Sequence, residues 1–369
     1  MFHLIYRLFY DPDNILRLLR LFRYISVRSI GAGITAFLVC LIVGPRLIRR
    51  LKRVGAVDQA WDYGVLDVTA KRGTPTMGGI LILIGALGSG LLWCNVANEF
   101  VWLCMLAGLW FGLLGSLDDL LKIRRASGVK GLSRGVKYLA QIMFGIAIAG
   151  IYLIPDLSPV PHKIAGSLYL PFVKFPVLEL GLAYVFIIVI FTVMSSNCVN
   201  ITDGMDGLAI VPAVLTALVL GIFAYVLGRE DYSAYLHYAY LPGAGELTVL
   251  CSALLGAGVG FLWFNAYPAS IFMGDAGSLA LGGMLGTMAI LIKQEVVFFI
   301  AGGVFVMEVA SSFIQDYIGL RLLGRRIFYR APLHFSFLHR GTGESKIAVR
   351  FWIIAAVFAA LAVATMKLR

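Results

Sequence analysis

The sequence predicts an all-α polytopic integral membrane protein, and three observations support that class. Hydrophobic residues make up 60% of the 369 residues and charged residues only 14%, whereas soluble domains average ~45–50% and ~25%. The mean hydropathy is +0.88, which is more apolar surface than a soluble globule can bury. The apolar residues also form continuous runs without the two-residue alternation of membrane β-strands. We therefore expect a single transmembrane domain, residues 1–369.

Ten apolar runs are candidates for helices that cross a bilayer, which need about 20 residues. In chain order they are residues 29–48, 77–97, 99–117, 137–155, 178–196, 205–227, 245–264, 278–293, 296–316 and 349–367. The eighth run is short, and the ninth contains Glu308. Before the first run, residues 13–24 place Arg17, Arg20 and Arg23 on one helical face, which predicts an interfacial helix lying on membrane lipids.

The basic residues predict the orientation of the spans, because cytoplasmic loops carry an excess of lysine and arginine. They concentrate after the first, third and ninth runs, in segments 49–76, 118–136 and 317–348. These segments, with the shorter 197–204 and 265–277, are predicted to be cytoplasmic, and both termini lie outside. Basic residues near both chain ends argue against this orientation, but the three long loops outweigh them.

The net charge is +11. The excess of lysine and arginine in the predicted cytoplasmic loops accounts for it, so we expect no nucleic-acid partner. The cysteines lie in or beside apolar runs, without the spacing of a metal or redox site: Cys40, Cys94, Cys104, Cys198 and Cys251. We expect them to be free side chains in the core.

Five aspartates lie at the predicted cytoplasmic boundary, where an ionised group is costly: Asp118, Asp119, Asp203, Asp206 and Asp275. Each has a structural explanation by itself, as a charge cluster at a helix end or as a helix cap. Their gathering on one face, among asparagine, glycine and lysine, favours a polar functional site.

The neighbours of these aspartates indicate a phosphate site. Lys122 lies four residues after Asp118 and can hold a phosphate while a carboxylate serves as base or metal ligand. In a helix, Asn200 would share one face with the aspartates that follow it. Asn265 and the ring of Phe272 precede Asp275, which we expect to ligate Mg²⁺.

The remaining candidates lie in two loops. Lys71 and Thr76 precede the second run and can bind a phosphate, although the segment is not a Walker A sequence. His334 and His339 follow the ninth run, where a lone histidine is more often incidental than a ligand. No His/Cys cluster indicates zinc.

Six sequence patterns occur in order: TPTMGG at 74–79, DD at 118–119, NxxNxTDGxDG at 197–207, LWFN at 262–265, FMGDxGSL at 272–279 and SKIAVRFWI at 345–353. Over about residues 28–369 the chain thereby resembles the polyprenyl-phosphate N-acetylhexosamine-1-phosphate transferase superfamily, and within it the phospho-N-acetylmuramoyl-pentapeptide transferase family.

The resemblance implies ten transmembrane helices, periplasmic termini and a cytoplasmic active site in the bacterial inner membrane. It implies that UDP-N-acetylmuramoyl-pentapeptide and undecaprenyl phosphate are the substrates, that lipid I and UMP are the products, and that Mg²⁺ is required. It also suggests a homodimer. A related transferase that uses another UDP-N-acetylhexosamine is the first alternative.

The resemblance also implies roles for individual residues. Asp275 would bind Mg²⁺, and Asp118, with Asp119 beside it, would deprotonate or orient the lipid phosphate. The nucleoside would be surrounded by Asn200, Asp203, Asp206 and Phe272, with Phe272 stacking on uracil. Phosphate or supporting contacts would come from Lys71, Thr76, Lys122 and Lys137. Asn265 and His334 complete the predicted substrate-binding set.

One departure from the family concerns the loop after residue 333. The family usually has three consecutive histidines there, whereas this chain reads His334, Phe335 and Ser336. Three explanations stay open: the two missing imidazoles are dispensable, substrate contacts differ, or activity is reduced. The departure also raises the alternative of a non-catalytic scaffold, which the retention of all the aspartates disfavours.

A transporter or channel is the other alternative, because acidic residues inside a membrane often mark ion paths. It predicts acidic residues at mid-span and often inverted repeats. Here the aspartates cluster at one face, only Glu308 lies well inside a run, and no repeat is visible.

Overall fold

The structure is a computed structural model that describes residues 1–10, 15–57, 73–124, 131–154 and 157–368. Eight helices in this part are long and apolar enough to cross a membrane. They include α2 (Ile25–Val54), α5 (Glu99–Arg124), α6 (Arg134–Leu153), α8 (Tyr184–Thr202, preceded by η2, Gly181–Ala183), α9 (Ile210–Leu227), α11 (Glu246–Asn265), α12 (Gly274–Leu291) and α16 (Glu344–Ala364, followed by η4, Thr365–Lys367). Each overlaps a predicted run, which confirms the prediction of an all-α polytopic membrane protein.

The second and ninth predicted runs differ from simple spans. The second forms α4 (Gly79–Trp93), which has only 15 residues. The ninth is broken into α13 (Glu295–Ala301) and α14 (Gly303–Phe313), which continues as the π-helix η3 (Ile314–Leu322), and the two parts meet at 84°. The prediction of one continuous span over 296–316 is therefore wrong, because hydropathy does not report a change of helix direction at Gly302.

The N-terminal segment forms two short helices rather than one. The 3₁₀-helix η1 (Ile15–Arg23) coincides with the predicted interfacial helix, and an unpredicted helix α1 (Phe2–Phe9) precedes it. The rings of Phe2 and Phe22 stack with their centroids 5.0 Å apart, and both contact Trp93 at the end of α4. Aromatic packing thus fixes this pair of helices to the bundle.

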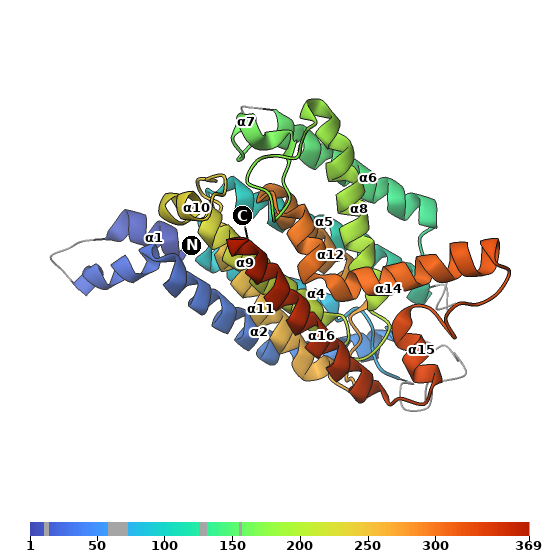
Figure 1. The fold of residues 1–369 in the computed structure, drawn as a ribbon. Coiled ribbons are helices and arrows are strands. Elements are labelled where there is room, and N and C mark those ends of the chain that lie inside the picture. Colours follow the sequence, from blue (N-terminus) through green and yellow to red (C-terminus); the bar gives the residue numbers. More distant parts are fainter. Residues whose placement is uncertain (11–14, 58–72, 125–130, 155–156, 369) are drawn as a thin grey trace.

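The two ends of the bundle carry different short elements (Figure 1). Both termini lie near α10 (Glu230–Tyr235), and α7 (His162–Ala165) with the antiparallel pair β1 (Ser167–Leu168) and β2 (Leu178–Glu179) extends from the same side. The helix α15 (Leu333–His339) lies at the opposite end. All the cysteines are buried and free, as predicted.

Helices α11 and α12 form the centre of the bundle. Close approach of their neighbours depends on glycine, as is common in membrane helices. An ideal Cβ on Gly256 of α11 would lie 2.0 Å from the carbonyl oxygen of Gly33 in α2. One on Gly79 of α4 would lie 2.0 Å from the Gly277 backbone in α12. These contacts draw α2 and α4 onto the central pair and leave little room beside the start of α12.

A buried ion pair joins α2 and α11 close to the first residues of both helices. The guanidinium of Arg28 donates two hydrogen bonds of 2.6 Å to the carboxylate of Glu246, and Arg28 is 1% exposed. Glu246 also accepts the backbone N–H of Asn95 at 2.9 Å. Removal of one partner would leave the other charge buried without compensation.

We expect Arg28→Met to lower the free energy of unfolding by about 3–5 kcal/mol. The double variant with Glu246→Leu should recover much of the loss, since it removes both charges. Thermal unfolding in one detergent measures both variants. A double variant no more stable than Arg28→Met alone would contradict this account.

Candidate active site

The polar site forms where the start of α12 meets the end of α5. Asp119 of α5 accepts a hydrogen bond of 3.1 Å from the backbone N–H of Ala276, so it caps the first turn of α12. Gly274 begins α12 with a φ of 71°, which favours glycine. An ideal Cβ on Gly115 would lie 2.1 Å from the carbonyl oxygen of Asp275. The two glycines therefore allow the helices to bring their carboxylates together.

Three of the five predicted aspartates gather here. One carboxylate oxygen from each of Asp118, Asp119 and Asp275 lies within 4.8 Å of the others. Asp118 and Asp119 lie near the end of α5, and Asp275 lies in the first turn of α12. Their spacing along the sequence therefore does not predict that they meet. The structure brings these three carboxylates together, and their roles in binding stay predictions.

Two lysines lie among the three carboxylates. The Nζ atom of Lys137 lies 2.7 Å from Oδ2 of Asp118 and 2.7 Å from Oδ2 of Asp275. The Nζ atom of Lys122 lies 2.7 Å from Asp118, 3.1 Å from Asp275 and 3.4 Å from Asp119. With all three carboxylates ionised, the two ammonium groups would leave one negative charge without a partner, and a further cation could offset it.

The three carboxylates differ in their access to solvent. The side chain of Asp118 is 0% exposed, that of Asp119 3% and that of Asp275 16%. Oδ1 of Asp118 accepts the backbone N–H of Leu132 at 2.6 Å, and its other oxygen faces both lysines. Asp275 is therefore the carboxylate of this cluster that offers most surface to a ligand.

Asn200 and Asp203 lie beside the cluster, at the end of α8. The amide of Asn200 donates hydrogen bonds to Oδ1 of Asp275 (2.9 Å) and to the hydroxyl of Ser278 (2.8 Å). Burial, with the carboxylates of Asp275 and Asp119 nearby, raises the pKa of Asp203 to about 8.

The segment after α8, residues 203–207, forms a loop that other segments hold in place; we call it the 203–207 loop. Oδ2 of Asp206 accepts the backbone N–H of Ala269 at 3.0 Å. Oδ1 of Asn265 accepts the backbone N–H of Gly207 at 3.0 Å, and its amide donates to the carbonyl of Ile271. Asn265 is only 4% exposed and clamps two loops together. Its predicted contact with a substrate stays a prediction.

The segment before α4 adjoins the same site. The hydroxyl of Thr76 lies close to the start of α12, where an ideal Cβ on Gly274 would be 2.9 Å from it. The backbone N–H of Phe272 donates to the carbonyl of Pro75 at 2.8 Å. The segment that carries Thr76 thus lies beside the start of α12, and the predicted roles of Thr76 and Phe272 stay predictions. Lys71 lies outside the described residues.

His334 is predicted to bind substrate, but its side chain is 0% exposed. Its Nδ1 atom lies 3.0 Å from Oε2 of Glu308. The two residues in place of the family's histidines have partners of their own. The ring of Phe335 packs against the imidazole with the centroids 4.2 Å apart, and the hydroxyl of Ser336 hydrogen-bonds the backbone N–H and carbonyl of Arg330.

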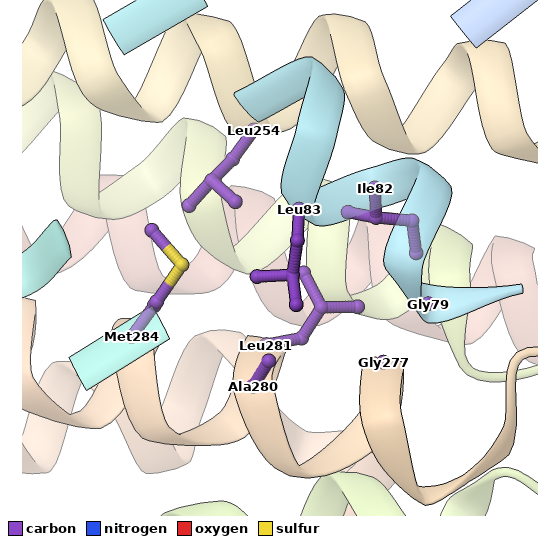
Figure 2. Close-up of a pocket in the computed structure, with 8 residues that line it drawn as sticks. All are labelled: Gly79, Ile82, Leu83, Leu254, Gly277, Ala280, Leu281 and Met284. Carbon is purple, nitrogen blue, oxygen red and sulfur yellow. The ribbon is translucent and has the colours of Figure 1, made fainter. Parts of the chain in front are cut away.

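The pocket drawn in Figure 2 is apolar, unlike the site formed by the carboxylates and lysines. It is lined by Gly79, Ile82, Leu83, Leu254, Gly277, Ala280, Leu281 and Met284. The side chains that point into it carry only carbon and one sulfur atom (Figure 2). The pocket is an apolar space among α4, α11 and α12, so the chemistry lies with the carboxylates and lysines.

Sequence reasoning missed some residues of the site. Ser278 and the backbone N–H of Leu132 support Asn200 and Asp118, and no pattern in the sequence marks either role. Glu308 did carry a signal, as an acidic residue inside an apolar run, but its partner His334 follows 26 residues later in another helix.

The bundle and its charged cluster define a class: polytopic membrane proteins with a polar site of carboxylates and lysines where helix ends meet. Comparison with known families refines that class. The sequence model described as glycosyl transferase family 4 matches residues 101–293, which contain Asp118, Asp119 and Asp275. A phospho-N-acetylmuramoyl-pentapeptide-transferase signature matches residues 71–83.

Full-length relatives agree with these matches. A phospho-N-acetylmuramoyl-pentapeptide-transferase of Oleidesulfovibrio alaskensis is 46% identical over 366 residues, which cover 99% of this chain and 100% of the relative. Proteins of that name from Nitratidesulfovibrio vulgaris and Citrifermentans bemidjiense are each 44% identical over 369 residues, with the same coverage. The chain belongs to the phospho-N-acetylmuramoyl-pentapeptide-transferase family.

Proposed function

We propose that the protein transfers phospho-N-acetylmuramoyl-pentapeptide from its UDP-linked form to undecaprenyl phosphate, giving lipid I and UMP. The full-length identity of 44–46% to transferases of that name carries the proposal. The cluster of carboxylates and lysines supports it, because transfer between phosphates depends on positioning and on positive charge near the phosphate oxygens.

In the proposed step, an oxygen of the lipid phosphate forms a bond to the β-phosphorus of the UDP-linked substrate. The bond from that phosphorus to the oxygen bridging the two phosphates breaks, and UMP leaves with that oxygen and its electron pair. One pyrophosphate linkage replaces another, so the reaction is nearly balanced and reversible.

The residues of the site suit Mg²⁺ as the further cation. Mg²⁺ prefers oxygen ligands and is usually held by one or two carboxylates together with substrate phosphates. The three carboxylates within 4.8 Å provide such oxygens. We propose that Asp275 holds the ion, because it is the most exposed of the three. Bound there, Mg²⁺ would offset the charge of the diphosphate.

The lysines and Asp118 are proposed to orient the phosphates. Lys122 and Lys137 place their ammonium groups at the mouth of the cluster and can donate to phosphate oxygens. Asp118 holds both lysines and has no exposed surface. Of its two predicted roles, the geometry favours orientation over proton removal, and a lipid phosphate is largely ionised at pH 7.

The nucleoside is proposed to lie beside the 203–207 loop. Asp203 and Asp206 belong to the loop, and Asn200 lies just before it in the last turn of α8. Phe272 follows Ile271, whose carbonyl accepts the hydrogen bond of Asn265. We retain uracil stacking on Phe272 as part of the proposal. Direct phosphate contacts by Lys71 and Thr76 also remain predictions.

The orientation in the membrane belongs to the same proposal. We propose ten spans, with α4 second and the bent α13–α14 pair ninth, in the bacterial inner membrane. An even number of spans fits termini at the same end of the bundle (Figure 1). The exposed arginines after α14 include Arg321, Arg325 and Arg326, and they favour a cytoplasmic position for the opposite end. The family resemblance adds a homodimer, which a mass measurement in detergent can test.

The function is tested by UMP release from the purified protein with undecaprenyl phosphate, UDP-N-acetylmuramoyl-pentapeptide and Mg²⁺. No UMP under any lipid or metal condition would refute the proposal. Release with UDP-N-acetylglucosamine instead would change the substrate and keep the reaction type.

Metal removal should have a large effect in the same assay. We expect EDTA to lower UMP release at least about 100-fold, because the diphosphate charge is then offset by the lysines alone. Added Mg²⁺ should restore the rate, and Ca²⁺ should restore less of it because it tolerates looser geometry. Full activity in excess EDTA would rule out the metal role.

A further inference from the structure

Glu308 and His334 form a buried pair that the proposed chemistry does not use. Both side chains are 0% exposed, and Nδ1 of His334 lies 3.0 Å from Oε2 of Glu308. The backbone N–H of His334 also lies 3.5 Å from the same oxygen. A carboxylate inside a membrane helix is costly and requires a partner. The histidine provides it: we assign the ring proton to Nδ1, because an ionised carboxylate oxygen can only accept a hydrogen bond.

The other side of the imidazole faces the 203–207 loop. An ideal Cβ on Gly204 would lie 2.4 Å from Nε2 of His334, so only glycine lets the ring lie against the loop backbone at this distance. Nε2 itself is buried and has no hydrogen-bond partner among the described residues. The ring therefore lies in close contact with the loop backbone at Gly204.

The loop rests on the same elements that carry the pair. Met205 and Leu208 pack in a small buried cluster with Val304 of α14, Leu338 of α15 and Phe351 of α16. This cluster is distinct from the main core of the bundle. The 203–207 loop is thus seated on α14–α16, and the Glu308–His334 pair joins two of these helices beneath it.

We infer that Glu308 and His334 are positioning residues that set the position of the 203–207 loop beside the acidic cluster. Glu308 fixes the orientation of the imidazole, and the imidazole supports the loop backbone at Gly204. The consequence for nucleotide binding rests on the proposed function, because Asp203 and Asp206 are proposed to face the nucleoside. His334 then acts through the loop and needs no contact with the substrate, which agrees with its burial.

Hydrogen–deuterium exchange of the loop amides tests the inference without any substrate. Glu308→Leu keeps most of the side-chain volume and removes the acceptor, and we expect exchange at residues 203–207 to rise about tenfold. Glu308→Gln retains an acceptor oxygen and should change it less than about threefold. His334→Asn retains a donor near Nδ1 but withdraws the ring from Gly204, so it should also release the loop.

Glu295→Leu is a matched control, because Glu295 is a buried carboxylate that accepts the hydroxyl of Tyr184 near the far end of α12. It should destabilise the protein without raising exchange at residues 203–207. If Glu308→Leu does not fold, His334→Asn decides the question. Unchanged loop exchange in whichever of these two variants folds, or an equal rise in Glu295→Leu, would overturn the inference.

Kinetics distinguish this inference from the proposed function. In Glu308→Leu and His334→Asn we expect KM for the UDP-linked substrate to rise about tenfold while kcat falls less than about threefold. Equal falls in kcat and kcat/KM would contradict a positioning role for the loop. Absence of UMP from the unaltered protein would refute the proposed function, whereas loop exchange would still decide the role of the pair.

Discussion

Asp275→Asn is expected to lower kcat at least about 10³-fold. The amide keeps the size of the side chain but removes the negative charge that the proposed Mg²⁺ site needs. It also turns one oxygen that faces Lys122 and Lys137 into a donor or a weaker acceptor. UMP release at saturating substrate measures the loss, and added Mg²⁺ should not restore it.

The control for this variant is Asp231→Asn, which makes the same change at an exposed carboxylate paired with Arg229 on α10. Its activity should match that of the unaltered protein. Thermal unfolding should show that Asp275→Asn remains folded. A folded Asp275→Asn protein with a near-normal rate would remove Asp275 from the metal site.

Lys137→Met is expected to have two effects of opposite sign. It removes the ammonium that lies 2.7 Å from both Asp118 and Asp275. At about 4 Å and an effective dielectric of about 20, one such charge contributes about 4 kcal/mol. That energy corresponds to about 10³ in affinity, and solvent at the partly exposed Lys137 screens much of it. We therefore expect Mg²⁺ to bind at least about tenfold more tightly, because less positive charge opposes it. We expect kcat/KM to fall about 10²-fold, because a phosphate donor is lost.

Isothermal titration with Mg²⁺ and UMP release measure the two effects separately. Lys137→Arg keeps the charge and should leave Mg²⁺ affinity within about threefold. Lys367→Met is the matched control. Lys367 is exposed, and its ammonium donates to the hydroxyl of Tyr235 rather than to a carboxylate of the acidic cluster. Weaker Mg²⁺ binding in Lys137→Met would contradict the electrostatic account, and an unchanged kcat/KM would remove Lys137 from the phosphate site.

Local features of the sequence were sufficient for the fold class and for most of the spans. Hydropathy depends only on neighbours along the chain, and every helix long enough to cross a membrane in the described part overlaps a predicted run. The same local signal could not report the break at Gly302, because the residues on both sides are equally apolar. It also missed α1, whose eight residues are too few for a span.

The candidate site was partly predictable. An aspartate at a membrane boundary is costly wherever it occurs, so its presence marks a site from the sequence alone. The sequence did not indicate which of the five aspartates lie next to one another in the folded protein. Asp118, Asp119 and Asp275 share one cluster, whereas Asp206 holds the backbone of Ala269 and Asn265 clamps the 203–207 loop.

By itself, then, the sequence determined that this is a helical membrane protein with acidic residues concentrated on one side and, through its resemblance, its family. Tertiary structure decided that Lys137 bridges two carboxylates and that Glu308 holds His334 beneath Gly204. The physical reason is that the hydropathy of a segment and the cost of a charge within it depend on that segment alone. Pairing depends on helix packing, which brings together side chains as far apart in the chain as Lys137 and Asp275.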